Sequence, residues 1–330
     1  MPLTIDPYSA VNWETFHQYK ASLHGHTDES DGTKTPAQMI DAWIAAGYDI
    51  VAITDHDHVT WPWTDFDRDP EELGLLAIQG QEMSNVEAHR HHTASLFNSW
   101  VGTTGYTLET AYAAIQAVNG VAVMAHPGNR YARGWVDDPY PPSFYANFFS
   151  TYSCLLGFDI CVRDGLFIVT DLWDALLEQL MPSRPVWGFG MDDSHELTSI
   201  GFTYVVVLSD ELSTAKIKSA LQAGQHYVCY DHDASVLTPP PIITEISVNT
   251  TKIEITATNY AEIRWISNGK IIELGESLSI VENTKLKKYV RAEIEGENGI
   301  IYTNPWGFDS VHHAPRPRPI DIPSANPTMR

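Results

Sequence analysis

Histidines and carboxylates occur together at several separate places along this chain of 330 residues. The chain contains 14 histidines, and most of them directly follow a short apolar segment. Imidazole and carboxylate groups in combination suit Zn, Mn or Fe, and no thiolate stands among them to change that preference. These positions make nine side chains candidate metal ligands: His24, His26, Asp31, His56, Glu82, His92, His126, Asp193 and His195.

The segments that precede these clusters are predicted to be strands of an α/β fold. From about residue 19 to 230, short apolar segments alternate with amphipathic ones, which favours strands alternating with helices. In barrels built from βα units the carboxyl ends of the strands form the functional face, so six separate strand ends can converge on one pocket. We expect strands at 19–23, 49–54, 75–79, 121–125, 158–162, 186–191, 203–208 and 227–229, and helices at 35–46, 108–118, 171–180 and 213–224.

A metal site is not the only explanation of a histidine after a strand. Such a residue can also cap the strand or make a hydrogen bond within the core. Applied to the whole set, that explanation requires six independent coincidences, whereas convergence on a metal site accounts for all of them at once. The clusters therefore predict a metal centre.

Composition and charge exclude several classes of protein. The chain carries 42 acidic against 20 basic residues, a formal net charge of −22, so its surface repels nucleic-acid backbones and anionic lipid. A small anionic substrate is still acceptable, because bound cations dominate the electric field around them. We expect a small-molecule partner and neither a nucleic-acid polymer nor a membrane.

The cysteines and the N-terminal residues indicate the expected cellular location. Cys154, Cys161 and Cys229 have no paired spacing, so we expect buried small hydrophobes rather than disulfides or a zinc–thiolate site. The N-terminus lacks the basic and apolar regions of a signal peptide, and no apolar run reaches the length of a membrane span. The sequence therefore favours a cytoplasmic protein.

A change in composition divides the chain near residue 239. Three prolines, Pro239 to Pro241, predict a linker, after which alternating apolar and polar residues replace the helix pattern. Asn268-Gly269 and Asn298-Gly299 are typical of hairpin turns between such strands. We expect a metallohydrolase barrel at 1–238, a small antiparallel β-sandwich at 239–310 and a proline-rich tail at 311–330. Residues 129–152 are expected to form a long loop over the site.

Five short segments carry most of the candidate ligands. In chain order they are His24-Gly25-His26-Thr27, Ser30-Asp31-Gly32, Ile53-Thr54-Asp55-His56-Asp57, Ala125-His126-Pro127 and Asp193-Ser194-His195. In this order, over roughly residues 19 to 230, they resemble the PHP (polymerase and histidinol phosphatase) superfamily. Glu82 in Gly80-Gln81-Glu82-Met83-Ser84 is similar to the glutamate that bridges metals in that family. Tyr289–Glu293 and Tyr302–Pro305 resemble a β-domain often appended to PHP proteins.

The resemblance implies a distorted (β/α)7 barrel that holds two to three divalent metal ions, which would be Mn, Fe or Zn. Carried over by position, one metal would be held by His24, His26, Glu82 and Asp193. A second would be held by Glu82, His92 and His126, and a third by Asp31, His56 and His195. Asp31 stands where some relatives have a histidine, which favours Mn or Fe at the third site. His92 is preferred because an apolar segment follows it, and His91 is the alternative.

These ligands imply hydrolysis. Divalent cations lower the pKa of a bridging water, so that hydroxide can attack near neutral pH, and they neutralise a phosphate substrate. The sequence contains no P-loop and no serine or cysteine elbow, so direct attack is favoured over a covalent intermediate. We expect a metal-dependent phosphoesterase of a small phosphorylated metabolite or nucleotide, with Glu82, Asp193 and His195 as catalytic residues. The alternatives are a metallohydrolase of a carboxylic ester, carbamate or amide, and a non-catalytic binding protein.

Arginines and tryptophans near the motifs are candidates for substrate contact. Arg130 and Arg133 follow the fourth motif, and Arg163 follows another predicted strand. Arginine favours bidentate phosphate contacts, although each of these side chains could equally pair with surface acids. Two roles, stacking on a base or sugar and covering the rim of the barrel, are open for Trp61, Trp63 and Trp135.

Overall fold

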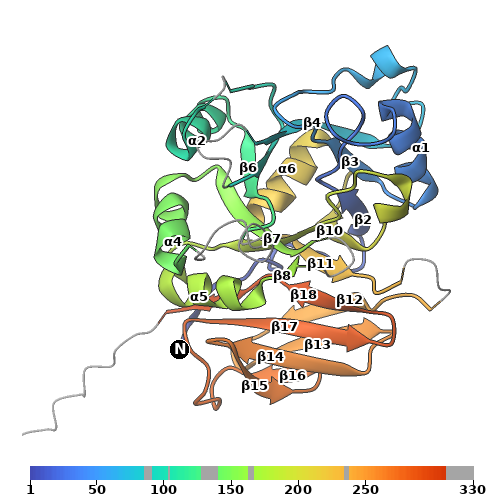
Figure 1. The fold of residues 1–330 in the computed structure, drawn as a ribbon. Coiled ribbons are helices and arrows are strands. Elements are labelled where there is room, and N and C mark those ends of the chain that lie inside the picture. The colour runs from blue at the N-terminus through green and yellow to red at the C-terminus, as the bar shows by residue number, and fades with distance from the viewer. Residues whose placement is uncertain (85–90, 103–104, 128–139, 163–166, 234–237, 310–330) are drawn as a thin grey trace, which may run out of the picture.

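The computed structural model describes residues 1–84, 91–102, 105–127, 140–162, 167–233 and 238–309. The tail predicted at 311–330 and residues 129–139 of the predicted loop lie outside the described residues. Within the described ranges the protein is a mixed α/β structure with one large sheet and a smaller three-stranded sheet. Helices flank the large sheet, and the C-terminal strands gather at one end of the molecule (Figure 1).

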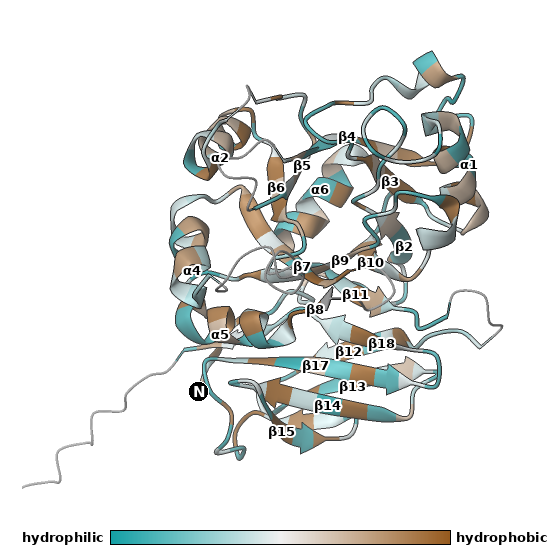
Figure 2. Cartoon of the chain, in the orientation of Figure 1, coloured by the Kyte–Doolittle hydropathy of each residue, from teal (hydrophilic) through white to brown (hydrophobic). Residues whose placement is uncertain are grey.

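The large sheet sets the strand ends of the motifs side by side. Its order through this region is β11-β10-β2-β3-β4-β5-β6-β7, and β9 pairs with β7. The three strands β2, β3 and β4 run parallel, and so do β6, β7 and β9, as predicted for βα units. β3 and β6 are hydrophobic throughout (Figure 2), as expected for strands covered on both faces. The bounds are β2 His17–Ser22, β3 Ile50–Ile53, β4 Leu76–Met83, β5 Thr93–Leu96, β6 Val121–Met124, β7 Leu155–Val162, β8 Phe167–Ile168, β9 Trp187–Met191, β10 Thr203–Ser209 and β11 His226–Tyr230.

The sheet departs from a regular (β/α)7 barrel in the direction of its strands. β5 runs antiparallel to β4 and β6, and β10 runs antiparallel to β2 and β11. β9 comes close to β10 and β11, because Gly190 has no side chain to collide with Val228. No hydrogen-bonded ladder joins β9 to β10 in the part of the chain that the structure describes. The sheet therefore curves back on itself without forming a closed ladder among those residues.

Most helices begin and end close to the predicted residues. The side chain of Thr35 accepts a hydrogen bond from the Gln38 amide in a capping box, which fixes the start of α1. α5 begins at Thr170, one residue before the predicted start, and Val169 precedes it. The bounds are α1 Pro36–Ala45, α2 Leu108–Ala117, α4 Pro142–Thr151, α5 Thr170–Leu180 and α6 Thr214–Ala223. None of the helices in the described ranges has both the length and the apolar character that crossing a membrane requires.

The loop predicted at 129–152 is wrong over its second part, which forms α4. Its prolines favoured a loop, but proline is well placed in the first turn of a helix, where its missing N–H needs no partner. Tyr145, Phe148 and Phe149 follow at helical spacing and are buried. This apolar face packs α4 against α5 and β7.

The C-terminal strands form two antiparallel layers, as the alternating pattern predicted. One layer is the three-stranded sheet, and the other extends the large sheet through the pairing of β18 with β11. Apolar residues of both layers, such as Ile253 and Trp265, belong to one buried cluster. The first layer consists of β12 Ile242–Val248, β13 Lys252–Thr258 and β16 Ser277–Ser279. The second consists of β14 Glu262–Ser267, β15 Lys270–Leu274, β17 Tyr289–Gly296, β18 Gly299–Thr303 and β19 Trp306–Phe308, with β1 Leu3–Ile5 beside β19.

Both predicted hairpins are present. Asn268 and Gly269 have φ angles of 50° and 63°, the left-handed pair that a two-residue turn between β14 and β15 requires. The second hairpin turns at Glu297 and Asn298, because Gly299 already pairs with Gly296 as the first residue of β18.

A buried ion pair fastens the C-terminal strands to α5. Arg291 of β17 donates from Nε and Nη2 to the two carboxylate oxygens of Asp174, at 2.8 and 2.7 Å. The hydroxyl of Tyr289 donates to the same carboxylate at 2.8 Å, and Nη1 of Arg291 donates to Glu293 at 2.7 Å. Bidentate pairing of this kind fixes direction as well as distance. The joint therefore holds α5 and β17 in one orientation.

Candidate metal centre

The first and last histidine motifs are joined through their backbones. Gly25 forms an isolated bridge with Ser194, and the His26 amide donates to the Ser194 carbonyl at 2.7 Å. Gly25 lies so close to the Trp43 ring that a Cβ would collide with it. This explains why a glycine separates the two histidines after β2. The end of β9 is thereby held against the end of β2.

His24 and His26 point the same ring nitrogen at one another. Their Nε2 atoms are 3.1 Å apart, and both residues are fully buried. Oδ1 of Asp193 lies 3.1 Å from Nε2 of His26 and 3.5 Å from Nε2 of His24. Without a cation, one imidazole must donate and the other accept, whereas a cation between them uses a lone pair from each. This pair forms the floor of the site.

Glu82, fully buried at the end of β4, lies at the centre of the cluster. Its Oε1 is 2.9 Å from Nδ1 of His92 and 3.0 Å from Nε2 of His126. Its Oε2 is 3.3 Å from Nε2 of both His24 and His26. One carboxylate therefore faces imidazoles on both of its oxygens, which is the arrangement that a bridging ligand needs.

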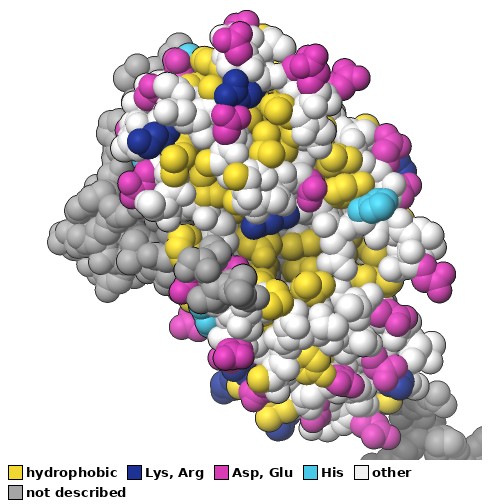
Figure 3. Space-filling model, turned by 90° about the vertical axis from the view of Figure 1, so that its right-hand side faces the viewer, with side chains coloured by type: hydrophobic (Ala, Val, Ile, Leu, Met, Phe, Trp, Pro, Cys, Tyr) yellow, Lys and Arg dark blue, Asp and Glu magenta, His cyan; other side chains and the backbone are white. Residues whose placement is uncertain are grey.

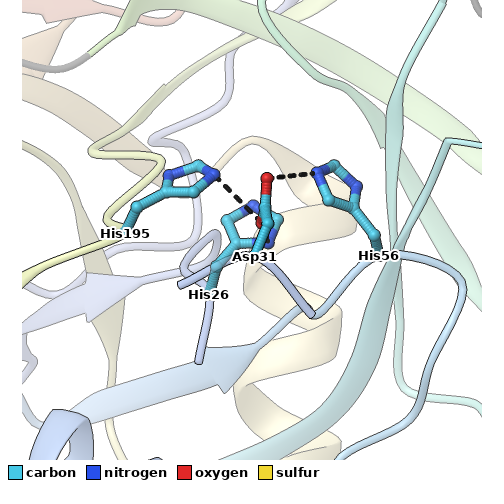
Figure 4. A group of neighbouring side chains, drawn as sticks. All are labelled: His26, Asp31, His56 and His195. Carbon is cyan, nitrogen blue, oxygen red and sulfur yellow. Dashed lines mark ion pairs between the residues drawn. The ribbon is translucent and has the colours of Figure 1, made fainter. Parts of the chain in front are cut away.

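Asp31, His56 and His195 form the open side of the site, above His26 (Figure 4). Nε2 of His195 lies 3.3 Å from Oδ1 of Asp31, and Nε2 of His56 lies 3.5 Å from its Oδ2. Nδ1 of His56 also lies 3.0 Å from Oε2 of Glu82, which links this side to the centre. The side chain of Asp31 is 53% exposed, so solvent reaches the cluster here.

Among the described residues three groups of neighbouring donors result, and in each the donor atoms lie within 4.8 Å of one another. One group coincides with a predicted set: His24, His26, Glu82 and Asp193. Another adds His26 to a predicted set and consists of His26, Asp31, His56 and His195. The third differs from the prediction because it contains His56 beside Glu82 and His92 and does not contain His126. His126 nevertheless lies at Oε1 of Glu82, the oxygen that His92 also contacts.

The geometry distinguishes His92 from His91. His92 faces Glu82, as described above, whereas the ring of His91 lies among aromatic rings. Its centroid is 4.5 Å from that of Tyr140 and 4.9 Å from that of Phe144. The preference for His92 therefore agrees with the side-chain directions. His89 lies outside the described residues.

The donor set fits divalent transition metals. Ligands held at about 2.1 Å from one metal stand about 3.0–3.4 Å apart, which is the spacing of the facing atoms here. Among the described residues Oε2 of Glu82 has no aligned hydrogen bond, although imidazole nitrogens surround it. A buried carboxylate oxygen in that state is costly unless a cation compensates it. Nitrogen and oxygen donors without thiolate suit Zn, Mn or Fe.

The electrostatics favour ionised carboxylates among the imidazoles. Burial alone would raise the pKa of Glu82, but the nearby charges of His24 and His92 outweigh it and hold that pKa well below its ordinary value. The pKa of Asp193 is lowered in the same way, against burial, chiefly by the charge of His24. Burial also lowers the pKa of His26, yet hydrogen bonds to Asp193 and Glu82 raise it to about 10. The site thus attracts positive charge.

Asp55 lies in the third of the five motif segments, but no role was predicted for it. Its carboxylate accepts hydrogen bonds from the Thr27 amide, the Thr27 hydroxyl and the Ser30 hydroxyl, each at 2.7 Å, and from the Thr60 hydroxyl. The residue is fully buried. Asp55 therefore holds the loop between His26 and Asp31 in place.

Asp159 is a further buried acid that sequence reasoning missed. It lies at an irregularity in β7, between the strands whose ends carry His126 and Asp193. Burial, and then the negative charge of Asp193, raise the pKa of its carboxyl well above the ordinary value. The only signal in the sequence was a lone acid inside the otherwise apolar segment Leu155–Val162.

Two of the candidate ligands have a left-handed backbone. The φ angle is 30° at His126 and 52° at Asp193. Such conformations cost about 1–3 kcal/mol for residues other than glycine and cluster at functional sites. One residue separates each of them from the end of its strand, β6 or β9, so the strained backbone is at the turn that directs the side chain inward.

The predicted substrate contacts are only partly visible. Arg130, Arg133, Arg163 and Trp135 lie outside the described residues. Trp63 is buried in the apolar core, which is inconsistent with stacking on a substrate. Trp61 is 40% exposed and lines a separate pocket beside Leu212.

The fold of the chain is similar to that of a solved structure. The chain aligns over 92% of its length with 98% of a two-domain protein from Bacteroides vulgatus that contains a predicted PHP-like metal-dependent phosphoesterase, at 16% identity and a TM-score of 0.55. The chain has a PHP-like fold. An alignment of that length must include most of the described C-terminal strands, so the PHP-like fold here comes with an appended β-region.

Other solved structures resemble the chain at lower TM-scores. PsfC from Pseudomonas syringae aligns at 15% identity and a TM-score of 0.47, over 66% of this chain and 93% of its own. The lesion-specific endonuclease PfuEndoQ from Pyrococcus furiosus aligns at 14% identity and a TM-score of 0.45, over 64% of this chain and 57% of its own. No protein-family model matches the chain, and no curated protein matches it.

Proposed function

We propose that this protein is a metal-dependent phosphoesterase of a small phosphorylated metabolite or nucleotide. The observation that carries the proposal is the surroundings of Glu82, whose buried carboxylate meets imidazole nitrogens at 2.9–3.3 Å on both of its oxygens. The PHP-like fold supports it, since the similar protein from Bacteroides vulgatus is described as containing a predicted PHP-like metal-dependent phosphoesterase.

The residues of the site divide into a floor and a rim. His24, His26 and Glu82 are fully buried and would hold the metals in place. Asp31 is the most exposed of the candidate ligands, so the substrate would enter from its side. Divalent cations bound here would polarise a substrate oxygen and activate water. They would also supply the positive charge that this acidic chain otherwise lacks around a phosphate.

Three of these side chains are the ones we assign to catalysis. Glu82 would keep neighbouring cations close together through its two oxygens. Asp193, whose Oδ1 lies 3.1 Å from Nε2 of His26, would stabilise the buried floor of the site. His195 is a quarter exposed, and its Nδ1 lies 2.8 Å from the Asp193 carbonyl, so its ring is oriented with Nε2 toward the open side. This orientation suits a group that contacts the substrate.

The test is turnover of phosphomonoester, phosphodiester and aryl-ester panels by metal-loaded protein. Asp193→Ala and His26→Ala should lower phosphoester turnover about 1000-fold or more, as expected for loss of metal-dependent catalysis. Asp210→Ala, at an exposed acid of a surface ion pair, is the matched control and should leave it unchanged. Turnover of esters without phosphates would identify a carboxylic ester, carbamate or amide hydrolase instead. Bound metal without any turnover would identify a binding protein.

A further inference from the structure

A second pocket lies in the C-terminal region, and none of its residues belongs to the metal centre. It has a volume of about 680 Å³ and is lined by the β14–β15 hairpin, by the segment 284–287 and by Glu178 of α5. This volume lies within the range of about 300–1,000 Å³ that is typical of sites for small molecules. In Figure 1 the strands β14 and β15 lie at the opposite end of the molecule from α2 and β4.

The pocket is basic in a chain that is strongly acidic. Lys270, Lys285 and Lys287 line it, and Lys288 follows directly. These are four of the chain's nine lysines, although the net charge of the chain is −22. Figure 3 shows how acidic side chains spread over one face of the molecule with few basic ones among them. The lysines are therefore concentrated here rather than distributed among the acids.

The ammonium groups that line the pocket form no ion pair among the described residues, although the Glu178 carboxylate, which accepts from Asn268, also lines it. Among the described residues no carboxylate oxygen lies within 4.0 Å of Nζ of Lys270, Lys285 or Lys287. By contrast, Lys216 and Lys252 each form an ion pair, at 2.8 and 2.7 Å. Like charges that share one pocket repel one another, and a bound anion removes that repulsion.

The other walls set further requirements for a ligand. Ile271 is 53% exposed and gives the pocket an apolar side. The Asn268 amide is anchored to Glu178, because Nδ2 donates to Oε1 at 3.3 Å. Its Oδ1 is buried and has no hydrogen-bond partner among the described residues, so it can accept from a ligand hydroxyl. The walls therefore fit an organic molecule that carries an anionic group.

We infer that this pocket binds a small multivalent oxyanion, a phosphate ester or a polycarboxylate. Lysine ammonium groups act as point charges and accept either kind of oxygen. A polymer is disfavoured because its further charges would extend past the lysines onto a protein whose net charge is −22, which repels them. The inference is independent of the proposed phosphoesterase activity, since the two sites share no residue.

The test is calorimetric titration of the metal-loaded protein with inorganic phosphate and, separately, with tricarballylate. Both anions are tested against the wild type, a Lys285→Ala/Lys287→Ala variant and a Lys216→Ala/Lys252→Ala control that removes the same charge elsewhere. We expect the pocket variant to bind at least one of these anions tenfold or more weakly than the wild type, and the control to bind like the wild type. Exposed surface substitutions of this kind change stability little, so all three proteins should fold.

A third variant separates this pocket from the metal centre. In Asp193→Ala the component that depends on Lys285 and Lys287 should persist, even where turnover is lost. Equal affinities of the pocket variant and the lysine control for both anions would overturn the inference. Tighter binding of a hexaglutamate peptide than of either small anion would also overturn it, in favour of an acidic protein partner. Binding of phosphate alone or tricarballylate alone would support it and identify the class of anion.

Discussion

The Nε2 atoms of His24 and His26 lie 3.1 Å apart in a fully buried part of the molecule. Two imidazoles in this arrangement compete for one proton unless a cation takes its place. The carboxylates of Glu82 and Asp193 lie against the same nitrogens and remain ionised, as their lowered pKa values indicate. The protein thus maintains a negatively charged floor that a cation can neutralise.

His91 and His92 should differ sharply when they are replaced. We expect His92→Ala to lower metal affinity at least 10-fold, because its Nδ1 faces Glu82 at 2.9 Å. His91→Ala should leave metal affinity within about twofold and instead lower stability by about 1–3 kcal/mol, because this ring packs among aromatic side chains. Metal titration and urea unfolding of both variants check this. A larger loss of metal affinity in His91→Ala would reverse the assignment.

Asp55 should support the site without binding metal itself. Replacement by alanine leaves four donors, from Thr27, Ser30 and Thr60, without their acceptor. We expect Asp55→Ala to lower the free energy of unfolding by about 2–4 kcal/mol and metal affinity by about 10–100-fold. Asp55→Asn keeps the shape and one acceptor oxygen, so it should lose less of both. Urea unfolding and metal titration provide the measurements, and equal effects of the two replacements would argue against a positioning role.

The ion pair of Asp174 with Arg291 should be costly to break from one side only. We expect Arg291→Met to destabilise the protein by about 3–5 kcal/mol, because it leaves a buried carboxylate without its partner. The double variant Asp174→Leu/Arg291→Met should recover most of that loss, since no buried charge remains. Chemical unfolding of both single variants and the double variant measures the coupling. Additive losses would show that the two side chains act independently.

His226 should make stability depend on pH. Burial lowers its folded pKa from 6.5 to about 3, and its Nε2 lies 3.1 Å from the Gly188 carbonyl. Between these two values the unfolded chain binds a proton that the folded chain does not. Its contribution is therefore fully present above pH 6.5 and is lost as the pH falls toward 3, by at most about 1.4 kcal/mol per pH unit.

The matching measurement for His226 is urea unfolding of the wild type and His226→Gln from pH 7.5 down to 4.5. The variant should show a shallower fall in the free energy of unfolding over that interval, because glutamine does not titrate. Parallel curves for the two proteins would rule out His226 as a source of the pH dependence.

Much of the site could be predicted because its residues can be recognised from the sequence immediately around them. A histidine or acid directly after an apolar strand lies at the carboxyl end of that strand, and the structure brings all nine candidate ligands into one cluster. Asp159 could not be found in this way. It is a single acid within β7, and its place beside the site follows only from the pairing of β7 with β6 and β9.

The larger errors concern features that depend on tertiary structure. The prolines led to a loop prediction where α4 forms, because the apolar face of this helix is recognisable only from its packing against α5 and β7. Strand direction was also beyond the local pattern, because β5 and β10 have the composition of parallel strands but pair antiparallel to their neighbours. A buried strand is apolar whichever way it runs.

Metal content is the measurement that tests the metal centre most directly. Wild-type protein and a Glu82→Gln variant would be incubated with Mn or Zn, freed of unbound metal and analysed by mass spectrometry of the metal. The surroundings of Glu82 predict two to three metal equivalents per wild-type chain and at least one fewer in the variant, with Glu71→Gln, at an exposed acid, unchanged. Wild-type protein without stoichiometric metal, or equal metal content in Glu82→Gln, would contradict a metal centre built around Glu82.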